Sequence, residues 1–116
     1  MRVKRTERGW AGHFICGDRC LFRRNTLIEC GGKKIVVSTV GNMRTEGEVA
    51  ETIGCDRYYE TMAFEAIWVD PYWEADVGRQ LEFKSNWALS EVEYETDLKA
   101  DAMHEAVVKE LSRSIK

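Results

Sequence analysis

The sequence predicts a single α+β domain, residues 1–116, in which an antiparallel β-sheet of five to six strands carries a C-terminal α-helix packed on one face. Two patterns support this class: a hairpin signal centred on Gly31 and Gly32, and an amphipathic stretch near the end of the chain. The length of 116 residues is close to the commonest size of one domain. Four residues each of Trp, Tyr and Phe supply large side chains for a core.

The first predicted strands flank a short polar turn. Residues 12–16 suit a short strand, and residues 20–24 suit the strand that returns beside it. Between them lie Gly17 and Asp18, two residue types that tolerate the backbone angles of tight turns.

The strongest local signal is a hairpin formed by residues 26–30 and 33–38 around Gly31-Gly32. A two-residue glycine turn favours the tight hairpin connection and thereby sets the pairing register. In that register the opposed pairs are Glu29 with Lys34, Ile28 with Ile35 and Leu27 with Val36. Apolar residues therefore meet apolar residues, and the charged pair has opposite signs.

A second hairpin is predicted after a polar stretch, residues 42–52, that suits a loop. Residues 58–69 form its first strand, and Asp70-Pro71 forms the turn because proline pre-sets the backbone angle of a turn residue. Apolar and acidic residues then alternate from Trp73 to Phe83, which is the pattern of a half-buried strand. Gly78 within this strand suggests a β-bulge.

The C-terminal helix is predicted over residues 97–115, with Asp97 as its N-cap. Apolar residues at helical spacing should form the stripe that packs on the sheet. The predicted stripe consists of Leu98, Ala102, Ala106, Val107, Leu111 and Ile115.

The composition predicts a cytoplasmic protein without membrane association. The charged N-terminus is not followed by the apolar run of a secretory signal, and the longest aliphatic run, residues 35–37, is far too short to span a bilayer. Residues 1–59 carry eleven Lys and Arg against seven Asp and Glu, whereas residues 60–116 carry six against thirteen. This asymmetry favours two halves that pack together, although it also fits a basic face for an anionic partner.

Four residues have the chemistry of zinc ligands: His13, Cys16, Cys20 and Cys30. Three residues separate Cys16 from Cys20, whereas tight zinc motifs more often have two, and in a regular strand His13 and Cys16 would point to opposite faces. We therefore predict neither a metal site nor a cofactor, and we expect the cysteines to be reduced and mostly buried.

The string Tyr58-Tyr59-Glu60 is a candidate catalytic site. A tyrosine nucleophile, or an aromatic platform for a base, could be placed there. The alternative, favoured by strand alternation, is the start of a strand with one tyrosine inward and the other outward.

Basic and aromatic residues alternate in the N-terminal part, and they predict a binding surface of Arg5, Arg8, Trp10, Arg23 and Arg24. Arg23 and Arg24 are consecutive, so strand alternation places them on opposite faces. The inward arginine should meet an acidic group of the C-terminal half, and the outward one should stay available to an anionic partner.

Several segments resemble a family of small uncharacterised proteins encoded by bacteriophages and prophages. The segments that carry the resemblance are residues 8–16, 20–27, 53–64 and 103–108. The resemblance implies a bacterial cytoplasm and a phage accessory role such as blocking a host defence. The family has no established activity, so it assigns no catalytic residue.

The expected function is therefore that of a small binding module for a macromolecular partner, with a protein favoured, a nucleic acid as the second choice, and a homodimer also compatible with the sequence. The alternative is a small enzyme acting on a nucleotide or nucleic acid. Its site would use the tyrosine pair, Glu60 and the arginine pair, Arg23 and Arg24, which would have to converge in one pocket.

Overall fold

The computed structural model describes residues 2–45, 49–54, 56–81, 88–91 and 94–116. Within these residues, one antiparallel sheet and one C-terminal helix confirm the predicted α+β class. In chain order the elements are β1 (Lys4–Arg8), η1 (Gly17–Arg19), β2 (Cys20–Cys30), β3 (Lys33–Arg44), β4 (Ala50–Glu51), β5 (Tyr59–Val69), β6 (Tyr72–Gln80), β7 (Ala88–Leu89) and α1 (Tyr94–Ser114). None of the described helices is long and apolar enough to cross a membrane.

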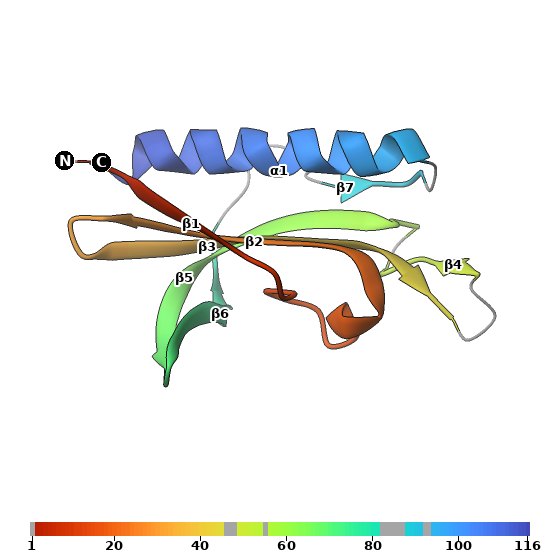
Figure 1. Cartoon of the computed structure of the whole chain (residues 1–116), viewed down its shortest axis with the longest axis horizontal. Coiled ribbons are helices and arrows are strands. Elements are labelled where there is room, and N and C mark those ends of the chain that lie inside the picture. Colours follow the sequence, from red (N-terminus) through yellow and green to blue (C-terminus); the bar gives the residue numbers. More distant parts are fainter. Residues whose placement is uncertain (1, 46–48, 55, 82–87, 92–93) are drawn as a thin grey trace.

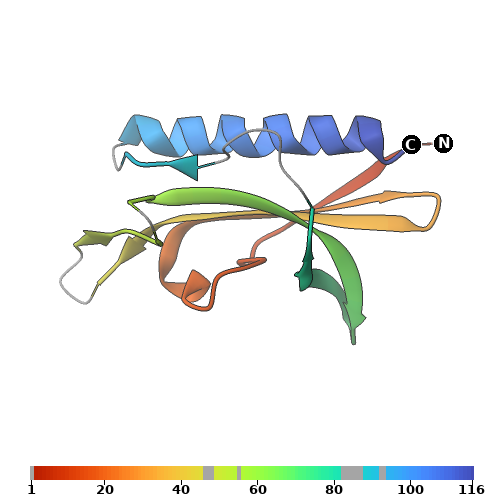
Figure 2. The same cartoon turned by 180° about the vertical axis from the view of Figure 1, so that it is seen from behind.

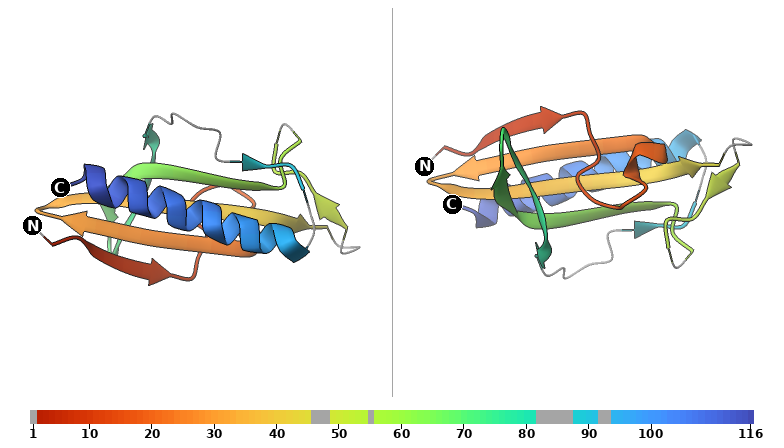
Figure 3. Two further views of the ribbon diagram at one scale, coloured as in Figure 1. Left: turned by 90° about the horizontal axis from the view of Figure 1, so that it is seen from above. Right: turned by 90° about the horizontal axis from the view of Figure 1, so that it is seen from below.

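The molecule has two layers, because α1 lies along one face of the sheet (Figure 1; seen from behind in Figure 2). The strand order is β1-β2-β3-β5-β6, with β4 paired to β3 and β7 paired to β5. The helix runs along the three central strands (Figure 3). On the other side, the β5–β6 hairpin and the loop of residues 9–19 both bend away from the helix (Figure 1). We call the two sides of the sheet the helix face and the loop face.

The β2–β3 hairpin has the predicted turn and register. Glu29 pairs with Lys34, and the next two rungs also pair as expected. Gly31 and Gly32 have φ angles of 59° and 87°, which L-residues with side chains rarely adopt. The hairpin is longer than predicted, because β2 runs without a break from Cys20 to Cys30 and β3 continues to Arg44.

The predicted strand at residues 12–16 is wrong, since this segment is an irregular loop in which Phe14 has a φ of 74°. The strand that pairs with β2 is instead β1, which places Arg8 opposite Asn25. The sequence of β1, Lys-Arg-Thr-Glu-Arg, has no apolar alternation because both of its faces are largely exposed at the edge of the sheet. Its role as a strand therefore depends on its partner rather than on its own pattern.

The β5–β6 hairpin has the predicted turn at Asp70-Pro71, whose peptide bond is cis. Pairing is irregular between Ala75 and Gln80, and this interval contains Gly78, where a bulge is predicted. Because the pairing is irregular, the predicted alternation of buried apolar and exposed acidic residues does not extend to the end of β6. Val77, which it predicts to be buried, is 71% exposed. Phe83, the predicted end of the strand, lies outside the described residues.

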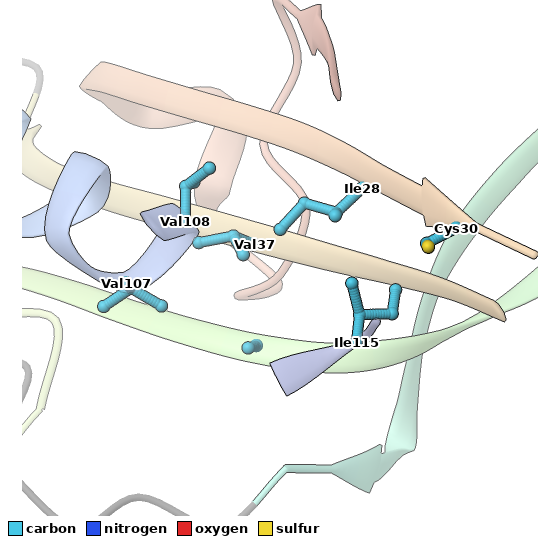
Figure 4. Packing of buried hydrophobic residues seen from close by; sticks show 7 residues of the cluster. Ile28, Cys30, Val37, Val107, Val108 and Ile115 are labelled. Carbon is cyan, nitrogen blue, oxygen red and sulfur yellow. The ribbon is translucent and has the colours of Figure 1, made fainter. Parts of the chain in front are cut away.

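The helix begins at Tyr94, so the predicted cap Asp97 lies inside its first turn. The predicted stripe is confirmed only in the C-terminal half, where Val107 and Ile115 join an apolar core with Ile28 and Val37 of the sheet (Figure 4). In the N-terminal half the stripe is wrong, because Leu98 is 60% exposed. The residues that face the sheet there are Thr96, Ala100 and His104, and Ala102 and Ala106 are exposed.

Candidate functional site

A buried hydrogen-bond chain explains why the N-terminal half of α1 presents polar residues to the sheet. His104 is fully buried, with Nε2 at 2.7 Å from the Thr26 hydroxyl and Nδ1 at 2.7 Å from the Thr39 hydroxyl. Thr26 donates to the Glu7 carboxylate over 2.8 Å, and Thr39 also contacts the Thr61 hydroxyl at 2.6 Å. Because the carboxylate can only accept, the hydroxyl proton of Thr26 goes to Glu7, and Thr26 must accept from Nε2–H of His104.

Burial is the main cause that lowers the pKa of His104, to about 4, and the nearby Arg24 guanidinium lowers it further. At neutral pH the imidazole is therefore uncharged, and because Nε2 carries its hydrogen, Nδ1 accepts a hydrogen bond from the Thr39 hydroxyl. His104 is therefore a structural histidine that joins α1 to the middle of the sheet.

The arginine pair is separated as strand alternation predicts. Arg24 is the inward residue, with ion pairs of 2.9 Å to Asp101, 3.0 Å to Glu105 and 2.9 Å to Glu7. Two of these acids belong to the C-terminal half, which confirms the expected partner. Arg23 is exposed, and the described residues form no ion pair with it.

Arg5 belongs to the same ionic network on the helix face. Its guanidinium contacts Glu7 at 2.6 Å and Glu105 at 2.9 Å. The hydrogen bond from Arg5 is the largest cause that lowers the pKa of Glu105, to about 2. Arg5 and Arg24 are thus held by carboxylates of this chain, and they do not share a face with Arg23 and Arg8.

Tyr59 is also a component of the helix side. Its ring is fully buried, it packs edge-on against Phe22 at 5.8 Å, and its hydroxyl donates to the Asp97 carboxylate. Burial and this hydrogen bond raise the pKa of Tyr59 above its ordinary value, which disfavours a phenolate nucleophile. Gly41 makes room for the ring, because a Cβ at this position would lie 2.4 Å from the Tyr59 Cδ2 atom.

Four of the five residues expected to form a catalytic pocket are divided between the two faces, and the fifth, Tyr58, is half-buried just before β5. Tyr59 and Arg24 face the helix, whereas Glu60 contacts His13 of the loop. Arg23 shares a cross-strand row with Glu60, with Val40 between them. A cleft of about 550 Å³ lies elsewhere, between the end of α1 and the sheet, where Lys33, Ile35 and Leu111 are among its lining residues.

On the loop face, His13 fastens the loop to the sheet. Its Nδ1 atom lies 2.7 Å from the Ser38 hydroxyl, and its Nε2 atom lies 3.2 Å from the Glu60 carboxylate. Glu60 is also paired with Arg57 at 2.7 Å. The hydrogen bond with His13 is the largest cause that lowers the pKa of Glu60. We call His13, Ser38 and Glu60 the latch.

The latch contains the three residue types of a hydrolase triad, but its serine is not placed to react. Ser38 is fully buried, and its hydroxyl also accepts a hydrogen bond of 3.1 Å from the Gly12 backbone N–H. A Cβ on Gly12 would lie 2.7 Å from the Ser38 Cβ, so no free volume separates loop and strand there. The geometry supports a positioning role for His13, because an acyl group could not reach the serine oxygen.

Arg8 and Trp10 connect the loop to the β5–β6 hairpin in an arrangement that we call the clasp. The Arg8 guanidinium stacks over the Trp10 ring at 4.8 Å and donates to Asn25 Oδ1 and to the Trp73 carbonyl oxygen. Trp10 contacts the Tyr72 ring at 5.1 Å and donates to the Glu74 carboxylate over 3.2 Å. Burial lowers the pKa of Arg8. Two predicted binding residues thus contact each other and hold the hairpin in place.

The four residues with the chemistry of zinc ligands do not form one cluster. Cys30 lies in the core under α1, whereas Cys20 lies in a second apolar cluster with Val40 and Met43. Cys16 packs beside that second cluster, and both ring nitrogens of His13 are used in the latch. Among the described residues, no three His, Cys, Asp or Glu side chains are placed to hold a metal ion. The expected absence of a metal remains a prediction.

An exposed apolar surface that the sequence pattern does not predict lies at the end of the β5–β6 hairpin. Ile67, Trp68, Val69 and Tyr72 are each between 46% and 53% exposed. We call these four residues the hairpin tip. Strand alternation predicts that half of them face a core, but the hairpin bends past the edge of the sheet, so neither of its faces is fully covered (Figure 1). The sequence carries no local signal of such a bend.

Comparison with known proteins found no match: no family model, no curated protein and no solved structure is similar to this chain.

Proposed function

We propose that this protein is a binding module that engages a protein partner through the hairpin tip. The observation that carries the proposal is the exposure of four large apolar side chains, two of them aromatic, at one end of the molecule. Exposed apolar patches on soluble proteins often mark interaction sites. Tryptophan and tyrosine are also the residues that most often dominate the binding energy of an interface.

The support beneath the tip is consistent with a preorganised interface. Trp68 packs against Trp73 at a ring separation of 5.4 Å, and the Lys34 ammonium lies 4.7 Å from the centre of the Trp73 ring. The clasp holds the neighbouring Tyr72 from the other direction. A surface that is held in its binding conformation loses less conformational entropy on association, which favours affinity.

A protein partner is favoured over a nucleic acid because most arginines of the predicted basic surface already bind other residues of this chain. Arg5 and Arg24 are paired with carboxylates, and Arg8 is held in the clasp. The hairpin itself carries acidic residues, among them the exposed Asp70 at its turn. A phosphate backbone would be repelled there rather than attracted.

The resemblance to phage and prophage proteins extends the proposal to the biological setting. A phage accessory protein that blocks a host defence can act by covering a surface of a host protein, which requires no catalytic residue. The residues expected to form a catalytic site are divided between the two faces, so we propose no enzymatic activity.

The proposal can be tested by quantitative affinity capture from bacterial lysate with two matched variants. Trp68→Ala removes the larger of the two aromatic side chains of the tip, and Tyr94→Ala removes an exposed aromatic side chain from the helix, on the other side of the sheet. We expect Trp68→Ala to reduce a captured bacterial protein at least tenfold, and Tyr94→Ala to leave its amount unchanged. Equal capture by all three proteins, or capture abolished by nuclease, would contradict the proposal.

A further inference from the structure

The cleft of about 550 Å³ between the C-terminal end of α1 and the sheet has the size of a small-molecule site. Such sites are typically about 300 to 1,000 Å³ in volume. Ile35 of β3 and Leu111 of α1 both line the cleft and both pack against the core under the helix, so the cleft lies on the helix face. None of its described lining residues belongs to the hairpin tip, so the two surfaces are separate.

Four aliphatic side chains line this cleft. Ile35 comes from β3, Leu81 follows β6, Leu111 belongs to the last turns of α1, and Ile115 comes directly after the helix. Ile115 is buried over the sheet (Figure 4), whereas the other three are only partly buried. The fold therefore leaves apolar surface of these three side chains accessible, and covering it with an aliphatic chain would be favourable.

Backbone hydrogen bonds hold the apolar lining in place. The Leu81 N–H donates to the Ala63 carbonyl oxygen on β5 over 2.9 Å, and the Ile115 N–H donates to the Leu111 carbonyl oxygen over 2.9 Å. Ile35 is paired within the ladder of β3 and β5. A site whose walls are fixed before a ligand binds loses less conformational entropy on binding.

Two of the charged residues that line the cleft are already paired within the chain. The Glu65 carboxylate lies 3.1 Å from the Arg79 guanidinium. The Lys34 ammonium lies 3.9 Å from the Glu29 carboxylate and 4.7 Å from the centre of the Trp73 ring. Each of these charges is thus balanced by a neighbour in the fold.

The remaining charged residue of the lining is Lys33, which leaves a positive charge beside the aliphatic side chains. Lys33 is exposed, and no ion pair joins it to the residues that the structure describes. The carbonyl groups at the end of a helix disfavour an anion. Here two of them already accept hydrogen bonds, the Lys109 carbonyl from Arg113 at 3.3 Å and the Leu111 carbonyl from the Ser114 hydroxyl at 3.2 Å. The unbalanced charge of the cleft is therefore positive, and it favours a ligand with a negative head group.

We propose that this cleft binds a small aliphatic carboxylate, such as a medium-chain fatty acid. The aliphatic chain lies against Ile35, Leu81 and Leu111, and the carboxylate binds the Lys33 ammonium. Both parts are needed, because a single exposed ion pair contributes little and an apolar lining alone does not distinguish one head group from another. The site adds a small-molecule ligand to the protein partner proposed for the hairpin tip, and it does not depend on that partner.

The test is an NMR titration of the ¹⁵N-labelled protein with acetate, and with octanoate and octylammonium below their micelle concentrations. Octanoate carries both the chain and the carboxylate, octylammonium carries the same chain with the opposite charge, and acetate carries the head group alone. We expect octanoate to shift the amide signals of residues 33–35 and 111–115 and to bind about fivefold more tightly than octylammonium. Acetate should give no saturable shift.

Two variants test the two parts of the site. Lys33→Gln should weaken octanoate binding about fivefold, because the ion pair is lost, and should not weaken octylammonium binding. Ser114→Trp places a large ring at an exposed position of the lining, so it should fill the cleft and abolish binding of both ligands. The amide spectrum of each variant shows whether its fold is retained.

Two control variants separate the cleft from other effects. Lys109→Gln removes an exposed lysine of α1 that does not line the cleft, and it should leave the affinity for octanoate unchanged. Trp68→Ala should also leave it unchanged, so the outcome does not depend on the proposed role of the hairpin tip. Equal affinities for octanoate and octylammonium, shifts centred elsewhere, or no saturable shift at millimolar octanoate would overturn the inference. Tighter binding of a short peptide with a C-terminal leucine than of octanoate would overturn the assignment to a small molecule.

Discussion

Replacing His104 should change how the stability of this protein depends on pH. The imidazole is buried and neutral, with its Nδ1 accepting from Thr39 and its Nε2 donating to Thr26. Protonation would add a hydrogen at Nδ1, where the Thr39 hydroxyl now donates, and would place a positive charge in a buried site near Arg24. The folded state therefore resists protonation, whereas the unfolded state does not.

The magnitude follows from the two pKa values. The pKa is 6.5 for an unperturbed histidine and about 4 in the fold, and each unit of difference corresponds to about 1.4 kcal/mol. Because the folded pKa is the lower one, this stability is complete above pH 6.5 and decreases as the pH falls towards 4. In this window the unfolded state takes up a proton that the folded state does not. The free energy of unfolding should fall by about 3 kcal/mol from this group alone.

The assay is chemical denaturation of the wild type and of His104→Gln at pH values from 7.5 to 4. Glutamine is uncharged at every pH in this range and retains a donor and an acceptor. The difference in unfolding free energy, wild type minus variant, should therefore decrease by about 3 kcal/mol over the range. Glu7 and Glu105, whose pKa values are lowered, are present in both proteins, so their contributions cancel in the difference. A difference that stays constant across the range would refute the argument.

Three further substitutions on the helix face, two of them with a control variant elsewhere, test its packing, and denaturant unfolding measures the stability of all five variants. Arg24→Ala should cost about 1 to 2 kcal/mol, because it removes three ion pairs whose carboxylates are partly exposed and of which Glu7 and Glu105 keep Arg5 as a partner. Arg23→Ala should stay within about 0.5 kcal/mol, and equal effects would show that neither arginine is held as described. Gly41→Ala should cost about 2 kcal/mol or more, because its Cβ would overlap the ring of Tyr59, whereas Gly9→Ala, with no atom within 4 Å, should cost much less. Tyr59→Phe should cost about 1 to 2 kcal/mol through the lost hydrogen bond, and an unchanged stability would contradict its burial.

Local sequence determined the elements whose folding depends on neighbouring residues. The β2–β3 hairpin has the predicted register, because Gly31-Gly32 sets the turn and the opposed residues already match. The turn at Asp70-Pro71 and the C-terminal helix were also predicted, because both depend on residues close together in the sequence. The alternation rule also predicted that Arg23 and Arg24 separate, since it requires only that both lie on one strand.

Part of the candidate site could also have been inferred from the sequence. The middles of β2 and β3 contain Asn25, Thr26, Ser38 and Thr39, and polar residues inside long strands indicate buried hydrogen bonds. The identity of their partners could not be inferred. His104 is 78 residues from Thr26, and His13 is 25 residues from Ser38. No sequence period relates such distant positions.

Tertiary structure decided the rest. β1 is a strand only because β2 pairs with it, and the helix turns Thr96, Ala100 and His104 inward because the sheet beneath offers hydroxyl groups instead of methyl groups. The hairpin tip is likewise exposed because the β5–β6 hairpin, whose pairing is irregular between Ala75 and Gln80, bends away from the helix (Figure 1). In each case, contacts with residues that are distant in the chain determine which way a side chain faces. The free energy of these contacts exceeds the local conformational preference of the residue itself.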